Sequence, residues 1–372
     1  MLPRNPEPPL RIVLALVLIT LAACAPRGQL IDAPDTGLPA RSIFIGTSRA
    51  EVVDQSLPQA FDRSETLTRL RYDITQPPAR KPGTITFPAP GRAPDPQTDF
   101  LVAARDHYPS ARAFRDDLRR DLAHRHGRAI VFVHGYNTNF PEGVLRLAQL
   151  GADFEMTETL VHYSWPSRGS VLGYAYDRDS ALFARDGLAE LLSELRAAGA
   201  REILVVGHSM GAALTMETLR QLALARKTDT LSALSGVVLI SPDIDVDVFR
   251  AQAHTVGRLP QPFFIFTSQK DRALGLSARI SGDTNRLGNL TDVKQVADLK
   301  VTMIDVGAFD VNAGHFNVGD SPALIKMLSQ IRRVATVLEG EQAGRSDLFS
   351  GVVLSVQSAT QIILTPVEAL AN

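Results

Sequence analysis

From residue 100 onward, short apolar runs of strand length alternate along the chain with segments whose apolar residues recur at helical spacing. In one such segment Leu188, Leu191, Leu192 and Leu195 fall on one face of a helix, and Gly199 follows where a left-handed cap would end it. This alternation is typical of a mostly parallel sheet covered by helices on both faces. We therefore expect one α/β domain. Its predicted strands lie at 41–46, 129–133, 160–165, 203–206, 237–240, 263–266 and 301–306.

One turn in this pattern is of the kind that carries a nucleophile. The sequence Gly-His-Ser-Met-Gly at 207–211 follows the run 203–206 and precedes the helical stretch 212–224. Strand, tight turn and helix in this order form a nucleophile elbow, in which a strained backbone pushes the serine hydroxyl out of the sheet. The two glycines let neighbouring backbone approach without a Cβ clash. The context predicts Ser209 as the nucleophile.

The elbow also fixes the chain order of its partners, which is nucleophile, then acid, then histidine. Of the eight histidines only two follow Ser209, and only His315 also follows the candidate acids and the last predicted strand. Asp271 stands just past the run 263–266, where we expect its carboxylate to reach the far nitrogen of His315. Asp243, after the preceding strand, is an alternative acid that the fold also tolerates. Either acid would orient the imidazole and stabilise its charged form.

The loop that begins at His134 is expected to supply one of two donors for an oxyanion. An oxyanion hole in this arrangement takes one backbone N–H from that loop and one from the residue after the nucleophile. We expect the donors to be Tyr136 and Met210. Asn139 and Pro141 then fit the N-cap and first turn of the next helix, whose positive end favours a developing oxyanion. His134 itself is expected to be structural.

Composition and spacing exclude several classes of partner. With 39 Lys and Arg against 40 Asp and Glu, the formal charge is −1, which gives no electrostatic reason to expect nucleic acid. His124 and His126 lack further ligands at suitable spacing, so we predict no metal and no cofactor. Trp165, the only tryptophan, ends a predicted strand, either as a wall of an acyl pocket or packed in the core.

The N-terminus is expected to direct export and membrane attachment. Arg4 and Arg11 precede the apolar run 12–23, which is a secretory signal pattern and is well short of the ~20 residues needed to span a bilayer. Leu-Ala-Ala-Cys at 21–24 looks like a bacterial lipobox, which implies lipid attachment to Cys24, such as palmitate, and cleavage before it. The alternative is an ordinary signal peptide with an incidental cysteine. Because Cys24 is the only cysteine, no intramolecular disulfide can form.

The predicted organisation has four parts. They are a signal peptide at 1–23, the lipid-attachment cysteine with a flexible spacer at 24–40, the α/β domain at 41–335, and a C-terminal segment of open role at 336–372. The apolar runs in this last segment are too short to cross a membrane.

Several motifs together resemble those of a bacterial family of esterase/lipase-like α/β-hydrolases, long catalogued as a domain of unknown function. The motifs are Phe-Val-His-Gly-Tyr-Asn at 132–137, Tyr-Ser-Trp-Pro-Ser at 163–167, the elbow at 207–211, Ser-Pro-Asp-Ile-Asp at 241–245 and the segment around Asp271. The similarity spans about 41–335. It implies the α/β-hydrolase fold and a triad of Ser209, Asp271 and His315, and it leaves the substrate open.

The expected function is that of a serine hydrolase, with carboxylesterase as the default. An acyltransferase is one alternative, and another is a non-catalytic envelope lipoprotein that retains the fold. The expected location is the bacterial cell envelope, where a lipid anchor would hold the protein on a membrane, facing the periplasm or the exterior. The expected partners are a small-molecule or lipid ester and the membrane.

Overall fold

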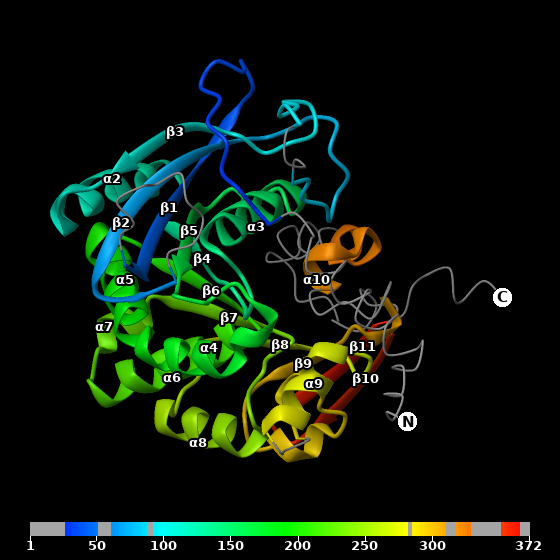
Figure 1. Cartoon of the computed structure of the whole chain (residues 1–372). Helices are drawn as coiled ribbons and strands as arrows, with labels where there is room; N and C mark the ends of the chain where they lie inside the picture. The colour runs from blue at the N-terminus through cyan, green and yellow to red at the C-terminus, as the bar shows by residue number, and fades with distance from the viewer. Residues whose placement is uncertain are drawn as a thin grey trace, which may run out of the picture.

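A computed structural model of the chain describes residues 27–50, 61–87, 92–281, 285–309, 317–328 and 351–364. Within these ranges an 11-stranded sheet runs through the centre of the molecule (Figure 1). Its strands are β1 (Ala40–Arg49), β2 (Arg63–Thr75), β3 (Val102–His107), β4 (Arg128–Val133), β5 (Thr159–Ser164), β6 (Glu202–His208), β7 (Leu234–Ile240), β8 (Phe263–Thr267), β9 (Thr302–Asp305), β10 (Gly351–Val356) and β11 (Ala359–Leu364).

The strands lie in the order β10-β11-β9-β8-β7-β6-β4-β5-β1-β2-β3. Every neighbouring pair from β11 to β1 is parallel. The two edges are antiparallel, formed by the β10–β11 hairpin on one side and by β1, β2 and β3 on the other. The predicted fold class, an α/β-hydrolase fold with a mostly parallel sheet, is confirmed.

Helices cover both faces of the sheet. They are α2 (Ala111–His124), α3 (Phe140–Asp153), α4 (Tyr174–Phe183), α5 (Arg185–Ala198), α6 (Met210–Leu224), α7 (Thr228–Ser232), α8 (Val246–Val256), α9 (Arg272–Ser281) and α10 (Asn317–Asp320), with short 3-10 turns η1 (Val171–Gly173), η2 (Leu287–Asn289), η3 (Val293–Val296) and η4 (Gly307–Phe309). Figure 1 shows α2, α5, α6 and α8 on one face of the sheet and α3 and α10 on the other.

The central strands are buried on both faces, which explains their continuous apolar runs. In β4, Val131 and Val133 face the core beneath α5 and α6, whereas Ile130 and Phe132 face the core beneath α3. Successive side chains of a strand point to opposite faces, so a strand between two helical layers needs apolar residues at every position.

The segment before β1 lies against the domain, although its composition predicts a flexible spacer. Ala33 donates a backbone hydrogen bond to the Val102 carbonyl at 2.9 Å, and Val102 donates one to Ile31 at 2.9 Å. The Arg105 guanidinium contacts the Asp32 carboxylate at 2.6 Å. These contacts join residues about seventy positions apart in sequence, so local composition carries no sign of them.

The C-terminal apolar runs extend the central sheet. They form β10 and β11, and β11 pairs in parallel with β9. The strands β2 and β3, which were not predicted, extend the opposite edge beyond β1. In the described part of the chain no helix is both long and apolar enough to cross a membrane.

Candidate active site

Ser209 lies between β6 and α6 in a strained backbone conformation. Its φ is 53° and its ψ is −120°, a combination that residues with a side chain rarely adopt. The turn is held by hydrogen bonds from the Ser209 N–H to the Ile240 carbonyl at 2.9 Å and from the Asp243 N–H to the Ser209 carbonyl at 3.3 Å. The structure thus gives Ser209 the geometry expected of a nucleophile elbow.

Glycines bring the loop after β4 against this serine. A Cβ on Gly211 would lie only 2.5 Å from the Val133 carbonyl oxygen, and a Cβ on Gly135 would lie 3.1 Å from the Ser209 Cβ. Real Cβ atoms essentially never come as close as the first of these distances, so the contact between α6 and the end of β4 requires glycine at 211. The segment 134–137 therefore lies beside Ser209.

The two expected oxyanion donors occupy the two sides of this contact. Met210 is the first residue of α6, where a helix leaves backbone N–H groups without an intrahelical acceptor. Tyr136 follows Gly135 in the loop, and its ring meets the Tyr174 ring edge to face with centroids 5.6 Å apart. Its hydroxyl donates to the Val171 carbonyl. The side chain of Tyr136 is thus held against Tyr174 and Val171.

A buried carboxylate, Asp177 of α4, fixes the loop that contains Tyr136. Its Oδ2 accepts hydrogen bonds from the Asn137 N–H at 3.3 Å and the Ser167 hydroxyl at 2.6 Å, and its Oδ1 accepts one from the Arg168 N–H at 2.7 Å. Asn137 needs this support because its φ is 55°. Burial raises the pKa of Asp177 above its usual range.

Arg49 holds the same loops from β1. Its guanidinium donates to the Thr138 carbonyl at 3.0 Å, to the Ser167 carbonyl at 2.8 Å and to the Ser164 hydroxyl at 3.0 Å. Full burial lowers the pKa of Arg49 to about 10, and the nearby Asp177 charge opposes that shift. A guanidinium with a pKa of about 10 still carries its charge at neutral pH, so Arg49 places a buried positive charge around the loop, near the Asp177 carboxyl.

His134 and Trp165 fill the space beneath this loop. Their rings stack with centroids 4.9 Å apart, and the Trp165 Nε1–H donates to the His134 carbonyl at 2.7 Å. Trp165 is fully buried, which agrees with core packing and not with a pocket wall. Burial lowers the pKa of His134 well below its usual value, and its ring nitrogens contact the carbonyls of Gly135 at 2.9 Å and Trp165 at 3.1 Å, so it packs as a structural group.

The two candidate acids have different surroundings. Asp271 follows β8, is 4% exposed, and caps α9 by accepting the backbone N–H groups of Ala273 at 3.0 Å and Leu274 at 3.1 Å through Oδ1.

Asp243, after β7, accepts hydrogen bonds through both carboxylate oxygens. They come from the Tyr174 hydroxyl at 2.9 Å and the Ser277 hydroxyl at 2.6 Å, and Arg286 lies 3.6 Å away. Its carboxylate therefore joins α4, α9 and the chain before η2 beside the elbow.

His315 and Cys24 lie outside the described residues. The chain that leads toward His315 leaves the sheet next to the Asp271 loop, because Val306 donates to the Thr267 carbonyl at 3.0 Å. A Cβ on Gly307 would lie 3.6 Å from the Ser268 hydroxyl, three residues before Asp271. The last described residue before His315 is Phe309, and α10 begins at Asn317.

A cavity of about 200 Å³ adjoins the elbow between α4, α6 and α8. Apolar side chains of Leu182, Met210 and Val248 line part of it, and Asp243 and Arg286 line another part. It thus combines apolar walls with a few polar groups, as ligand pockets do.

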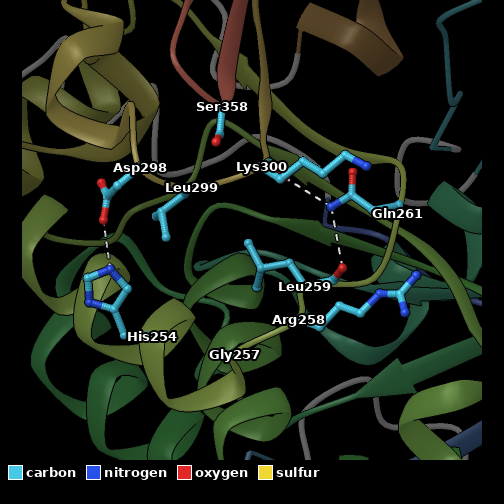
Figure 2. Close-up of a pocket in the computed structure, with 9 residues that line it drawn as sticks. All are labelled: His254, Gly257, Arg258, Leu259, Gln261, Asp298, Leu299, Lys300 and Ser358. Carbon is cyan, nitrogen blue, oxygen red and sulfur yellow. Dashed lines mark hydrogen bonds and ion pairs between the residues drawn. The ribbon is translucent and has the colours of Figure 1, made fainter.

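A larger cavity, of about 550 Å³, lies at the opposite ends of the strands, away from Ser209 (Figure 2). Its lining includes Gln261 and Lys300, which precede β8 and β9, so it faces the amino ends of the strands. His254 contacts Asp298 there at 2.8 Å. This cavity lies apart from Ser209, and size alone would point to the wrong end of the sheet.

Arg49, Asp177 and Ser167 are the residues of this site that sequence reasoning missed. Each of them binds partners that are distant in sequence. Arg49 and Thr138, for example, are 89 positions apart. The one local signal is the polar stretch that follows Trp165, which contains Ser167 and leads into α4.

Comparisons with known proteins identify the family of the chain. The family described as alpha/beta hydrolase of unknown function (DUF900) matches residues 110–332. No curated protein gives a significant match.

Solved structures resemble the chain at low identity. A hydrolase from Agrobacterium vitis is 12% identical, with 80% of this chain and 98% of that chain covered and a TM-score of 0.37. A cell surface hydrolase from Lactobacillus plantarum is 11% identical, with 57% and 93% covered and a TM-score of 0.33. An esterase from Pyrococcus furiosus is 10% identical, with 86% and 100% covered and a TM-score of 0.32.

Proposed function

Because the chain belongs to the alpha/beta hydrolase family of unknown function, we propose that it is a serine carboxylesterase that works through an acyl-enzyme intermediate. The observation that carries this proposal is Ser209 at φ 53° and ψ −120° between β6 and α6, with Gly135 of the neighbouring loop against its Cβ. Strain of this kind costs on the order of 1–3 kcal/mol and persists where the surrounding structure enforces it, often at active sites.

The proposed reaction begins when the His315 imidazole takes the Ser209 hydroxyl proton. The Ser209 Oγ then attacks the ester carbonyl carbon, and the backbone N–H groups of Tyr136 and Met210 bind the oxyanion. Collapse of this intermediate expels the alcohol, which receives the proton from His315. Water, activated by the same imidazole, then attacks the acyl-enzyme and releases the acid.

Asp271 is the proposed acid. Both oxygens of Asp243 accept hydroxyl hydrogen bonds, from Tyr174 and Ser277, so this carboxylate is engaged in joining α4 and α9. Asp271 is oriented by its cap on α9, and the chain that leads to His315 leaves the sheet beside its loop. Under this assignment Asp271→Asn should lower kcat far more than Asp243→Asn, and the reverse order would make Asp243 the acid.

The test of the nucleophile is a fluorophosphonate probe, which reacts with activated serines. We expect one adduct on Ser209 by mass spectrometry, and Ser209→Ala should lose the adduct and at least ~10³-fold of the turnover of a short p-nitrophenyl ester. Ser241→Ala is the matched control, because Ser241 is also buried, has a φ of 44° and follows a parallel strand. An adduct on Ser241, or near-normal turnover by Ser209→Ala, would refute the assignment.

We also propose that Cys24 carries a lipid and holds the enzyme on a membrane of the bacterial envelope. The support is the Leu-Ala-Ala-Cys sequence after an apolar run, in a chain with no other cysteine. Metabolic labelling with a radioactive fatty acid tests it: the full chain should incorporate label and Cys24→Ala should not. An unlabelled full chain would leave an ordinary signal peptide as the explanation.

A further inference from the structure

Exposed apolar side chains gather around the entrance to the candidate active site. Of the six large apolar side chains that are exposed in the described ranges, two line the cavity at the elbow and two lie in the turn η1, which contacts Tyr136. We name these four the apolar rim: Val171, 66% exposed; Leu172, 96%; Leu182, 51%; and Val248, 50%.

Contacts connect the members of the apolar rim to the elbow. The carbonyl of Val171 accepts the hydroxyl of Tyr136, whose N–H is the proposed oxyanion donor. Leu182 and Val248 line the cavity of about 200 Å³ that also includes Met210. The rim therefore lies beside the Tyr136 loop and the cavity at the elbow, where we expect a substrate to reach Ser209.

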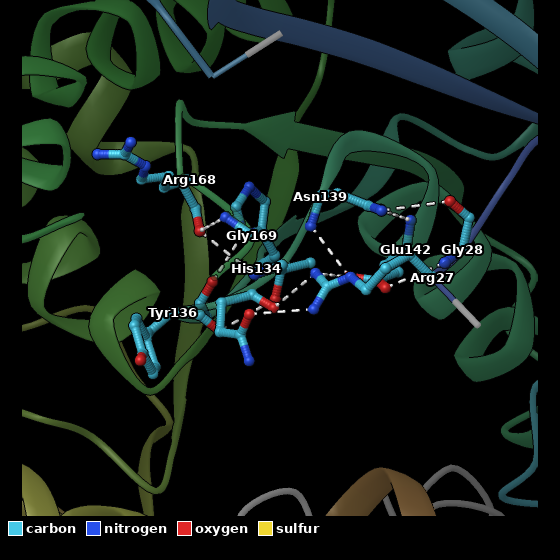
Figure 3. Close-up of polar contacts among 12 residues, drawn as sticks. Arg27, Gly28, His134, Tyr136, Asn139, Glu142, Arg168 and Gly169 are labelled. Atoms are coloured by element: carbon cyan, nitrogen blue, oxygen red, sulfur yellow. Dashed lines mark hydrogen bonds and ion pairs between the residues drawn. The ribbon is translucent and has the colours of Figure 1, made fainter. Parts of the chain in front are cut away.

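The described chain begins at this same face. The Arg27 guanidinium donates to Asn137 Oδ1 at 3.1 Å and to Glu142 at 2.7 Å, and the Gly28 N–H donates to Glu142 at 3.1 Å (Figure 3). A Cβ on Gly169 would lie 3.2 Å from Arg27, so Arg27 also touches the loop that leads to the rim.

Cys24 precedes Arg27 by three residues, which span at most about 11 Å when fully extended. A lipid on Cys24 must therefore enter its membrane close to the apolar rim. Leu172 is 96% exposed, and contact of its apolar side chain with water is unfavourable. The boundary between headgroups and acyl chains can accommodate such a side chain. The exposed side chains of Arg168 and Arg178 lie beside the rim and would attract anionic headgroups.

We infer that the apolar rim docks on the lipid bilayer that holds the Cys24 anchor, so that the active site opens toward the membrane. The inference rests on the proposed function and its lipid attachment. It identifies the substrate class as esters presented at a lipid surface. A second copy of the chain or another protein on the rim is the competing occupant.

The test places a fluorophore on the rim of the full-length lipoprotein in vesicles of phosphatidylethanolamine and phosphatidylglycerol. Leu172→Cys carries the label on the rim. Leu224→Cys is the matched control, because Leu224 is 61% exposed and lies at the far end of α6, about 21 Å along the helix from Met210. We expect lipids that carry a nitroxide near the headgroup to quench the Leu172→Cys label several-fold more strongly than the Leu224→Cys label.

Three results would overturn the inference. Equal quenching at the two sites would mean that the rim faces water. A Leu172→Cys label that is shielded from aqueous quenchers but untouched by lipid nitroxides would mean that a protein covers the rim. Labelling of the unmodified chain would mean that Cys24 is a free thiol without a lipid.

The same preparation separates this inference from the proposed function. A rim label in lipid together with a Ser209 that does not react with fluorophosphonate would reject the esterase and keep the orientation. A reactive Ser209 together with a rim label in water would do the opposite.

Discussion

The carboxylate of Asp177 accepts hydrogen bonds from two loops that meet at the carboxyl edge of the sheet. We predict that Asp177→Asn lowers kcat about tenfold or more with little change in KM, because an amide cannot accept from the backbone N–H groups of both Asn137 and Arg168. An unsatisfied buried donor costs about 1–3 kcal/mol. The affected Asn137 N–H adjoins the Tyr136 N–H, so we expect the oxyanion donor to be displaced. Steady-state kinetics on a soluble ester measure both constants.

The control for this change is Asp179→Asn, on an exposed carboxylate of the same helix. It should leave kcat and the melting temperature near those of the unmodified chain. If Asp177→Asn lowered the melting temperature and left kcat intact, Asp177 would be a structural residue with no part in positioning the oxyanion donor.

Single residues differ in how far the sequence predicts them. The turn at Ser209 and Met210 was predictable because strand, turn and helix follow each other within about twenty residues, so the elbow is a local pattern. Asp177 and Arg49 were not, because their hydrogen bonds depend on which loops the fold brings together. Asp271 falls between these cases, since its place after β8 is local and its proposed partner, His315, is distant in sequence.

Helix α3 begins with a capping box that also binds the N-terminal segment. Asn139 accepts the Glu142 N–H at 2.9 Å, Glu142 accepts the Asn139 N–H at 3.0 Å, and the Asn139 amide donates to the Gly28 carbonyl at 3.2 Å. We predict that Asn139→Ala lowers the free energy of unfolding by about 1 kcal/mol and also lowers kcat, since the cap adjoins the oxyanion loop. Urea unfolding and ester kinetics measure the two effects.

Ser110→Ala gives the matched control for this change. Ser110 caps α2 by accepting the Ala113 N–H at 3.2 Å, on the other face of the sheet. The Ser110→Ala variant should lower the free energy of unfolding by a similar amount and leave kcat unchanged. If Asn139→Ala and Ser110→Ala lowered kcat by the same factor, the α3 cap would affect catalysis only through global stability.

Elements were predictable where periodicity is strong. The strands from β4 to β9 are central, so burial on both faces gave each a run of apolar residues. The edge elements were less predictable, because β2 carries charged residues on its exposed face and the segment before β1 is held by pairing with β3.

At the scale of the whole molecule, two buried histidines make stability depend on pH. Burial lowers the pKa of His162 to about 3, and it lowers the pKa of His134 well below its usual value. Unfolded histidine binds a proton near pH 6.5, so between that pH and about 3 the unfolded chain binds more protons than the folded one. Above about pH 6.5 both histidines are neutral in the folded and the unfolded chain, so they do not reduce the free energy of unfolding. As the pH falls below 6.5, that free energy decreases.

We predict that the free energy of unfolding falls between pH 7.5 and pH 5, by up to ~1.4 kcal/mol per pH unit for each histidine. Urea unfolding at a series of pH values gives the slope. His162→Leu should make the slope shallower, whereas His124→Leu, on an exposed side chain, should keep it. A slope unchanged by His162→Leu would mean that His162 takes up no proton on unfolding.

The order of strands in the sheet has a consequence for folding during the proposed export. A chain that crosses a membrane from its N-terminus delivers β1 early, yet β1 lies between β2 and β5, and its parallel partner β5 begins more than a hundred residues later. The β9 edge likewise stays unpaired until β11 arrives. An unpaired strand edge invites pairing with other chains, so under the proposed export the chain would pass through an interval in which a chaperone, and not its own fold, protects these edges.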